Sequence, residues 1–253
     1  MNQLANKYGT YEKQKKLLAM MKDIDSILRN KGVKYSLCGG SLLGAVREKG
    51  FIPWDDDIDI MVDRKNYKRL IEALAEVKEY TPYQLNRYLW IDRIQYKDDK
   101  RHPLYADTID VFVMDNCPDN MLLRKIKLFL IMALQGMMKK DRDYKSVSLV
   151  MKLCLIITYV MGKVFSDERK FKWYHKVAQY GNNRETRFMT GYTDLFKCLS
   201  LRYPSSLFDK INDCSFEDAK FMITAEYDSY LSTQYGDYMT PPDEKDRLSI
   251  HMN

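Results

Sequence analysis

Acidic side chains at the start of an apolar run have the clearest potential for chemistry. Asp57 and Asp59 alternate with Ile58 and Ile60 in the sequence DDDIDIMV, which is the pattern of a half-buried strand. Alternate side chains of a strand share one face, so the two carboxylates repel each other unless a cation neutralises them. Mg²⁺ or Mn²⁺ takes one or two carboxylates and fills its shell with phosphate oxygens and water. The pattern therefore predicts a divalent-metal site.

A third carboxylate stands in a second apolar run. Asp110 lies between Ile109 and Val111 in the sequence TIDVFV, although aspartate is depleted in strands. If the two strands are neighbours, Asp110 joins Asp57 and Asp59, either as a metal ligand or as a base that accepts a proton. If the second strand is an edge strand, its carboxylate faces water instead.

A glycine turn precedes the acidic run. The turn consists of Gly39, Gly40 and Ser41. Glycines allow close approach of a ligand to the backbone, and the N–H groups at a helix start favour an anion, so the turn predicts a cradle for phosphate oxygens. Three nearby residues are further candidates for substrate binding: Arg47, Trp54 and Asp55. Arg47 pairs with a phosphate, with Asp55 or in a structural salt bridge, and Trp54 stacks on a base or packs internally.

These residues need a sheet and helices to hold them in place. Apolar spacing of three and four predicts helices, and runs that alternate or are rich in β-branched residues predict strands. The predicted helices cover 11–30, 42–48, 65–77 and 226–234, and the predicted strands cover 33–37, 57–62, 89–96 and 108–113. This order predicts an α+β fold, with a mixed sheet and flanking helices.

The positive charge of the chain is concentrated in one segment. The 253 residues carry 41 Lys and Arg against 35 Asp and Glu, a formal net charge of +6. Residues 121–176 hold 13 Lys and Arg and 4 Asp and Glu, a net +9, which leaves −3 for the rest. We expect this segment to be a basic helical insertion, with helices at 121–140 and 147–165, between a core at 1–120 and a part at 177–253 that completes it.

The insertion favours either packing against protein or contact with an anionic membrane surface. Two lysines interrupt its second helix, so a membrane span is not expected. The candidate membrane-facing charges are Lys139, Lys140, Lys163 and Lys170. Its basic residues alternate with aliphatic side chains rather than stacking aromatics, which excludes nucleic acid as a partner.

The cysteines and the N-terminus indicate the compartment. Five scattered cysteines without a CxxC pair predict neither a disulfide framework nor a structural zinc site. The first residues, MNQLANKYGTYEKQKK, lack the apolar stretch of a secretory signal. A reducing cytoplasm is the expected location.

Three motifs of the sequence resemble those of a known family. GGSLLGAVREKGFIPWDDDIDIMVDR, at 39–64, closely resembles the signature of the LicD family, which are nucleotidyltransferase-fold phosphotransferases related to fukutin-like ribitol-phosphate transferases. IDVFVMD, at 109–115, is similar to the downstream acidic strand of that family. YGDYMTPP, at 235–242, is similar to its C-terminal motif together with the Arg and His that follow. The resemblance covers most of the chain and is densest over 33–64.

The resemblance implies a nucleotidyltransferase-like core with defined roles. The GGS turn would hold nucleotide phosphates, Asp57 and Asp59 match the DxD motif, and Asp110 matches the third carboxylate; all three would be catalytic and metal-binding. The residues that the C-terminal motif would close over the nucleotide or the acceptor are Tyr235, Asp237, Arg247 and His251.

The resemblance also implies a reaction. Bacterial members of the family typically move phosphocholine from CDP-choline to a sugar hydroxyl of a surface glycan, as in a teichoic acid or lipopolysaccharide precursor, and release CMP. The implied partners are a CDP-activated alcohol and a glycan or lipid-linked glycan acceptor. The implied location is the cytoplasm, with the basic insertion on the inner face of the cell membrane.

Two other functions remain open at this stage. A nucleotidyltransferase that attaches NMP to a small molecule or a protein would use the same carboxylates but release pyrophosphate. A membrane-associated scaffold would keep the fold without catalysis, although the three intact aspartates, Asp57, Asp59 and Asp110, favour an enzyme.

Overall fold

The computed structural model describes residues 4–102, 105–140, 148–244 and 247. Its elements in chain order are α1 (Leu4–Tyr8), α2 (Tyr11–Asn30), β1 (Ser36–Leu37), α3 (Gly39–Arg47), β2 (Ile58–Asp63), α4 (Arg64–Val77), η1 (Lys78–Tyr80), β3 (Tyr83–Tyr88), β4 (Ile91–Tyr96), β5 (Thr108–Cys117), α5 (Met121–Met138), α6 (Leu149–Val164), α7 (Asp167–Ala178), β6 (Phe188–Gly191), β7 (Tyr203–Pro204), η2 (Ser205–Phe208), β8 (Ile211–Phe216), β9 (Ala219–Thr224) and α8 (Tyr227–Tyr235).

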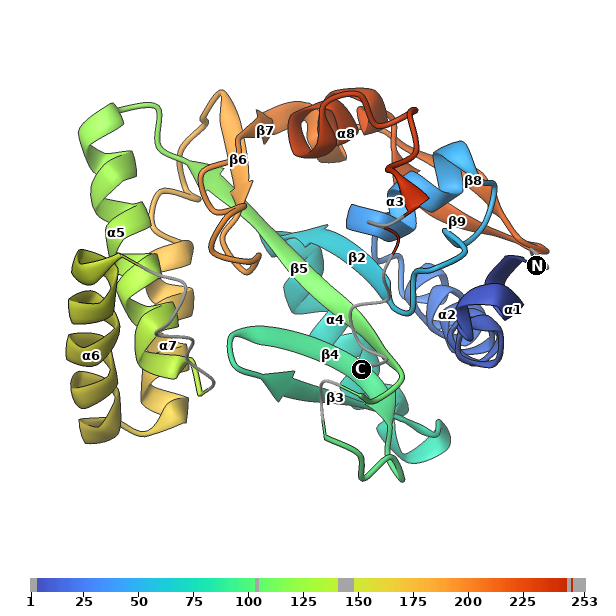
Figure 1. Ribbon diagram of the computed structural model, residues 1–253, viewed down its shortest axis with the longest axis horizontal. Coiled ribbons are helices and arrows are strands. Elements are labelled where there is room, and N and C mark those ends of the chain that lie inside the picture. Colours follow the sequence, from blue (N-terminus) through green and yellow to red (C-terminus); the bar gives the residue numbers. More distant parts are fainter. Residues whose placement is uncertain (1–3, 103–104, 141–147, 245–246, 248–253) are drawn as a thin grey trace.

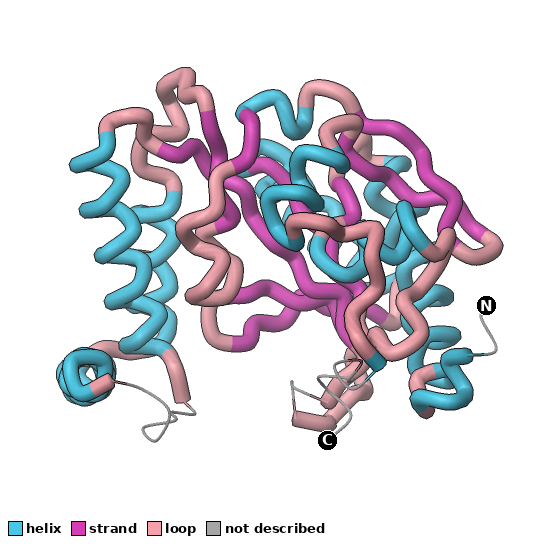
Figure 2. The backbone as a smooth tube through the Cα atoms, turned by 45° about the horizontal axis from the view of Figure 1, so that its top comes forward, coloured by secondary structure: helices cyan, strands magenta, loops and turns pink. Residues whose placement is uncertain are grey.

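Strands from distant parts of the chain form one mixed sheet in the middle of the molecule (Figures 1 and 2). The strand order is β1-β2-β5-β4-β3, while β6 also pairs with β5, and β7 pairs with β6. Strands β2 and β5 are parallel, whereas β1, β4 and β6 are antiparallel to their neighbours. The predicted α+β fold, a mixed sheet with flanking helices, is confirmed.

Alternation along β2 and β5 separates an apolar face of the sheet from an acidic one. The completely buried residues on the apolar face are Ile58, Ile60, Ile109 and Val111. Helix α4 covers this face. The hydroxyl of Tyr67 in α4 donates to Asp92, which is the register partner of Val111 on β4 and so lies on the same face. A slip of one residue would move the apolar set to the other face, so burial fixes the register. Asp59 and Asp110 therefore lie on the face opposite α4.

The C-terminal part returns to the first strand. The N–H of Thr224 in β9 donates to Oγ of Ser36 in β1 (2.9 Å), and the rings of Phe216 and Phe51 meet at 4.8 Å between centroids. Helix α8 follows and packs against α3. The helix expected at 226–234 is confirmed as α8. The sequence pattern predicts no strand after residue 177, whereas the structure has β6 to β9 there.

Helices α5, α6 and α7 form a layer at one end of the molecule (Figure 1). Helix α5 packs against both others. Two glycines let α5 and α6 approach closely: a Cβ on Gly136 would lie 2.8 Å from Oγ1 of Thr158, and a Cβ on Gly162 would collide with the backbone of Met137. The helices expected at 121–140 and 147–165 are thus present, and α7 is an addition to them.

Two lysines of this basic segment are internal. Nζ of Lys127 donates to the carbonyl oxygens of Asn116 (2.9 Å) and Tyr180 (3.0 Å), and burial lowers the pKa of Lys127 to about 8. Nζ of Lys170 donates to the carbonyl oxygen of Gly162 (3.1 Å), and the residue is 5% exposed. The prediction that Lys170 is a membrane-facing charge is therefore wrong. Within the described ranges, no helix combines the length and the apolar character needed to cross a bilayer.

Candidate functional site

Polar side chains form a row across neighbouring strands of the sheet. Asp59 of β2 is the register partner of Asp110 on β5, and Asp110 is in turn the partner of Arg93 on β4. Register partners project from the same face, so two carboxylates and a guanidinium are adjacent. Cys38 extends the row beyond Asp59, whose carbonyl oxygen accepts the N–H of Cys38 (3.0 Å). This row is the centre of the acidic face.

Asp110 is held in one orientation by two partners. Nη2 of Arg93 donates to its Oδ2 (2.7 Å), and the hydroxyl of Thr108 donates to its Oδ1 (3.0 Å). The side chains of Arg93 and Asp110 are 8% and 9% exposed. Burial raises the pKa of Asp110, whereas the charge of Arg93 and the hydroxyl of Thr108 act in the opposite direction. The result is a fixed carboxylate with more proton affinity than a solvated one.

Asp59 is surrounded by other carboxylates. Burial raises the pKa of Asp59 well above its usual range, and the charges of Asp57, Asp110 and Asp55 raise it further. The N–H of Asp59 donates to Oγ of Ser41 (2.9 Å), which joins β2 to the first turn of α3. Like charges in a poorly solvated place favour protonation unless a cation compensates them. The position is therefore suited to hold a cation.

The turn before β2 gives its three aspartates different environments. Asp56 is 1% exposed and points toward α2, where its carboxylate pairs with Lys13 (3.0 Å). Burial, the charge of Asp57 and a hydrogen bond to Asp57 raise the pKa of Asp55. The side-chain amide of Gln14 donates to the carbonyl oxygen of Asp55 (2.8 Å) and fixes the turn. Asp55 and Asp57 thus form an acidic cluster with Asp59 and Asp110. Asp56 instead holds the turn against α2.

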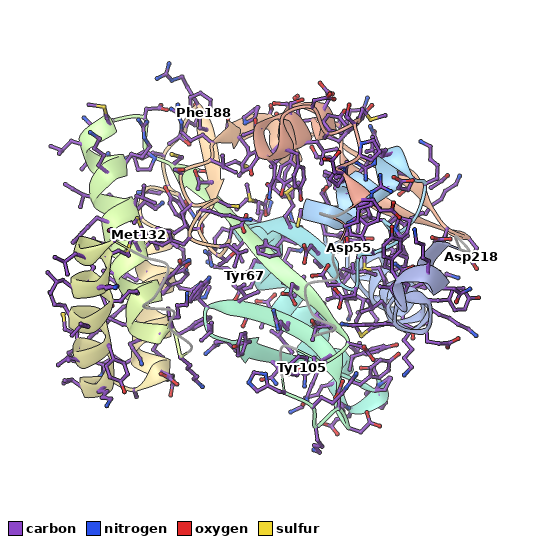
Figure 3. The ribbon with its side chains drawn as sticks, in the orientation of Figure 1. Asp55, Tyr67, Tyr105, Met132, Phe188 and Asp218 are labelled. Atoms are coloured by element: carbon purple, nitrogen blue, oxygen red, sulfur yellow. The ribbon has the colours of Figure 1, made fainter. Side chains whose placement is uncertain are left out.

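The two glycines at the start of α3 are required by the carboxylates. A Cβ on Gly40 would collide with the carboxylate of Asp55, and a Cβ on Gly39 would lie 2.8 Å from Oδ2 of Asp59. Gly39 also has a φ of +54°, which other residues rarely adopt. Figure 3 shows Asp55 beside this turn. Because the first N–H groups of a helix have no acceptor within it, the turn directs the positive end of the α3 dipole toward the cluster.

Two tyrosines of α8 adjoin the same cluster. The N–H of Gly39 donates to the hydroxyl of Tyr230, at 3.4 Å. Burial raises the pKa of Tyr235, and the charges of Asp59 and Asp55 raise it further, although the residue as a whole is 44% exposed. Tyr235 therefore lies within electrostatic range of these carboxylates, while part of its ring faces solvent. That it closes over the nucleotide or the acceptor stays a prediction.

Asp194, in the loop after β6, is a carboxylate near the acidic face that sequence analysis missed. The N–H of Asp194 donates to the carbonyl oxygen of Gly191 (3.1 Å), and its carboxylate accepts the N–H of Leu195 (2.6 Å). Burial raises the pKa of Asp194 to about 6. Its charge in turn raises the pKa of Asp59 and Cys38, so this loop borders the acidic face. A lone aspartate in a turn is common, and the sequence GYTDLF gave no signal for a site.

The donor set fits a hard divalent cation. Among the residues that the structure describes, no group of three or more His, Cys, Asp or Glu side chains is arranged so that it could hold a metal ion. Asp57, Asp59 and Asp110 offer carboxylate oxygens whose repulsion a cation would relieve. Mg²⁺ normally takes only one or two carboxylates and completes its shell with phosphate and water. One or two of these carboxylates would therefore need the oxygens of a phosphorylated substrate to complete the shell of Mg²⁺ or Mn²⁺, and a metal at this site stays a prediction.

The C-terminal segment folds back over the signature residues. The guanidinium carbon of Arg247 lies 5.2 Å from the ring centroid of Trp54, which is a cation–π contact. Asp237 is exposed and accepts a hydrogen bond from the hydroxyl of Thr240 (2.7 Å). The structure thus brings Arg247 to Trp54 but leaves Asp237 at the surface. His251 lies outside the described residues.

Arg47 ends α3 and fastens the C-terminal segment to it. Its Nε pairs with Glu48 (2.8 Å), and its Nη1 donates to the carbonyl oxygen of Tyr238 (3.0 Å). The side chain makes a structural salt bridge with Glu48 rather than a pair with Asp55, and binding of a phosphate by Arg47 stays a prediction. Nη2 of Arg47 is buried and has no partner among the described residues.

Comparisons with known proteins give a match to a family over part of the chain and a relative that aligns over most of it. Residues 32–141 match the protein family described as LicD/FKTN/FKRP, nucleotidyltransferase domain. The chain is similar to the lipopolysaccharide cholinephosphotransferase LicD of Haemophilus influenzae, with 27% identity over 242 residues that cover 87% of each chain. Uncharacterised proteins of Rickettsia prowazekii and Rickettsia typhi are 38% identical over 63 residues, 25% of this chain and 24% and 20% of theirs. The family match spans the glycine turn, the acidic strand and the strand of Asp110.

Proposed function

Because the chain belongs to the LicD family and is a transferase of phosphate-containing groups, we propose that it moves phosphocholine from CDP-choline to a sugar hydroxyl and releases CMP. The observation that carries this proposal is the register pair of Asp59 and Asp110 beside the start of α3. Carboxylates for a cation and N–H groups for phosphate are what transfer from a nucleotide diphosphate requires. The name of the relative from Haemophilus influenzae supports phosphocholine as the transferred group.

The first turn of α3 binds the diphosphate of the donor in this proposal. The N–H groups of Gly40 and Ser41 donate to phosphate oxygens. Because Gly40 and Gly39 have no Cβ, Asp55 and Asp59 have room beside this turn. Asp57 and Asp59 would hold Mg²⁺ or Mn²⁺, which would supply positive charge near the departing CMP.

Asp110 acts on the acceptor side or completes the cation site. Arg93 and Thr108 fix the direction of its carboxylate. Burial gives it a raised pKa, which makes it a stronger proton acceptor than a solvated carboxylate. As a base it would accept the proton of the sugar hydroxyl while the oxygen attacks the β-phosphorus of CDP-choline and the bond to CMP breaks.

The acceptor in this proposal is a glycan under construction at the inner face of the cell membrane. A lipopolysaccharide precursor agrees with the name of the relative from Haemophilus influenzae. A teichoic acid precursor offers the same chemistry, a sugar hydroxyl on a lipid-linked chain.

Product analysis tests the proposal. The full chain is incubated with Mg²⁺, a glycan acceptor and CDP-choline, CDP-ribitol or CDP-glycerol in turn, and CMP is measured. CMP from CDP-choline together with a phosphocholine-bearing glycan is the expected result. Pyrophosphate released from a nucleoside triphosphate would identify a nucleotidyltransferase instead. No turnover, together with no binding of Mg²⁺, would identify a scaffold.

A further inference from the structure

Helix α6 is apolar and packs against α5 on one side, but most of its side chains are exposed. Of its residues with a described side chain, only Gly162 is buried. Leu153, Ile157 and Val160 point along one side of the helix and are 53%, 56% and 58% exposed. A helix of this composition is normally buried in protein or in contact with a membrane.

The exposed surface continues onto α5. Ile126 and Phe129 are exposed in the N-terminal half of this helix, while Ile131 and Leu134 pack toward α7. The contact of Gly136 with Thr158 places α6 against the C-terminal half of α5, so the N-terminal half stays uncovered (Figure 1). We call the outer side of α6 and the uncovered half of α5 the α5–α6 face.

Charge selects the partner of this face. Lys125, Lys139, Lys140 and Lys163 are all exposed in this segment. The acidic side chains of α7, Asp167 and Glu168, are already paired with lysines. An apolar surface among lysines complements an anionic lipid surface. Two copies of the chain that met here would bring two segments of net +9 together, and their charges would repel each other.

We propose that the α5–α6 face docks on the surface of an anionic phospholipid bilayer. The apolar side chains enter the boundary between headgroups and acyl chains, and the lysines contact lipid phosphates. Docking does not require the helix to cross the bilayer, and no helix in the described part of the chain is long and apolar enough to do so. The inference deepens the proposed function, which puts the acceptor at a membrane, and rests on it for the purpose of docking but not for the binding itself.

The position of the face suits this role. Lys127 and Lys170 bind backbone carbonyl groups around α5 and so fasten the helical layer internally. Met132 of α5 lies at one end of the molecule, and Asp55 lies well away from it toward the other (Figure 3). A membrane on the α5–α6 face would therefore leave the acidic cluster uncovered.

Vesicle binding tests the inference directly. The full chain is sedimented with vesicles of phosphatidylcholine alone and with vesicles that also contain phosphatidylglycerol. We expect binding to the mixed vesicles only, and a weakening of at least about tenfold when four lysines are replaced in the variant Lys125→Gln/Lys139→Gln/Lys140→Gln/Lys163→Gln. A matched control removes the same charge from other exposed positions and should bind as the wild type does: Lys15→Gln/Lys16→Gln/Lys65→Gln/Lys68→Gln.

A second variant removes apolar surface at constant charge. Leu153→Ser/Ile157→Ser/Val160→Ser should also weaken binding to the mixed vesicles, and its thermal unfolding should match the wild type because these side chains are exposed.

Failure of the wild type to bind mixed vesicles would overturn the inference, as would equal losses in the lysine variant and its control. A dimer in sedimentation velocity without vesicle binding would assign the face to a second copy. CMP release from CDP-choline with a soluble acceptor is measured without vesicles, so a failure of the proposed function shows separately.

Discussion

Asp59 and Asp110 are register partners on adjacent parallel strands, so two carboxylates project side by side from one face of the sheet. Arg93, the next residue in the same row, binds Asp110 and leaves Asp59 among carboxylates. The asymmetry gives the two aspartates different tasks. A bound cation would relieve the repulsion at Asp59, whereas the guanidinium of Arg93 already compensates the charge of Asp110.

The first prediction concerns the charge at Asp59. Asp59→Asn removes one of the repelling carboxylates, so the variant should unfold at the same or a higher temperature than the wild type in metal-free buffer. Mg²⁺ with CDP-choline should raise the unfolding temperature of the wild type but not of the variant. Differential scanning calorimetry measures both. Asp218→Asn, at an exposed turn, is the control and should respond as the wild type does. An equal response of Asp59→Asn would exclude Asp59 as a cation ligand.

The second prediction concerns the buried pair of Arg93 and Asp110. Arg93→Gln leaves a buried carboxylate without its cation and should lower the free energy of unfolding by about 3 kcal/mol. Adding Asp110→Asn removes the stranded charge, so the double variant should lose less than the sum of the single losses. Urea unfolding of the three variants measures the coupling. Strictly additive losses would show that the two side chains do not stabilise each other.

The third prediction concerns Asp194 and pH. Its pKa of about 6 in the folded chain is above the usual 3.8, so the folded chain keeps a proton that the unfolded chain releases. Stability from this residue therefore falls as the pH rises from about 4 to about 6. Asp194→Asn keeps the acceptor for the N–H of Leu195 and removes the charge. Its advantage over the wild type should be absent near pH 4 and reach up to about 3 kcal/mol above pH 6.

Urea unfolding at several pH values measures this difference. A constant difference between Asp194→Asn and the wild type across the range would contradict a raised pKa at this position.

The fourth prediction concerns the glycine turn. Gly40→Ala places a Cβ against the carboxylate of Asp55, which must move away from Asp57. Forced contacts of this kind cost about 1–3 kcal/mol, and we expect CMP release to fall about tenfold or more. In an Asp55→Ala background the same substitution should cause little further loss. A full additional loss in that background would place the conflict elsewhere.

Local pattern was sufficient for the centre of the site. The alternation of aspartate and isoleucine from Asp57 predicted the strand, and burial of Ile58 and Ile60 set its faces. For the strand of Asp110 the sequence left two arrangements open, a neighbour of that strand or an edge strand, and the register shows that the two strands are neighbours. In these places short-range periodicity and long-range packing demand the same arrangement.

Other parts depend on contacts that no local pattern contains. Arg93 and Asp194 reach the acidic face only through the pairing of β4 and β6 with β5. The short strands β6 and β7 have too few residues for a period to appear. Lys170 has the sequence context of a surface lysine, but its amine binds a carbonyl oxygen of the preceding helix. The boundaries of the three predicted segments, 1–120, 121–176 and 177–253, stay a prediction.

CMP release is the most direct test of the central claim, that the carboxylates of Asp59 and Asp110 drive transfer of a phosphate-containing group. The full chain, Asp59→Asn and Asp110→Asn are incubated with CDP-choline, Mg²⁺ and a glycan acceptor, and CMP is measured with time. We predict that the wild type forms CMP and phosphocholine-bearing glycan in equal amounts, and that both variants are at least about a hundredfold slower. CMP formation at the wild-type rate in either variant would contradict the claim.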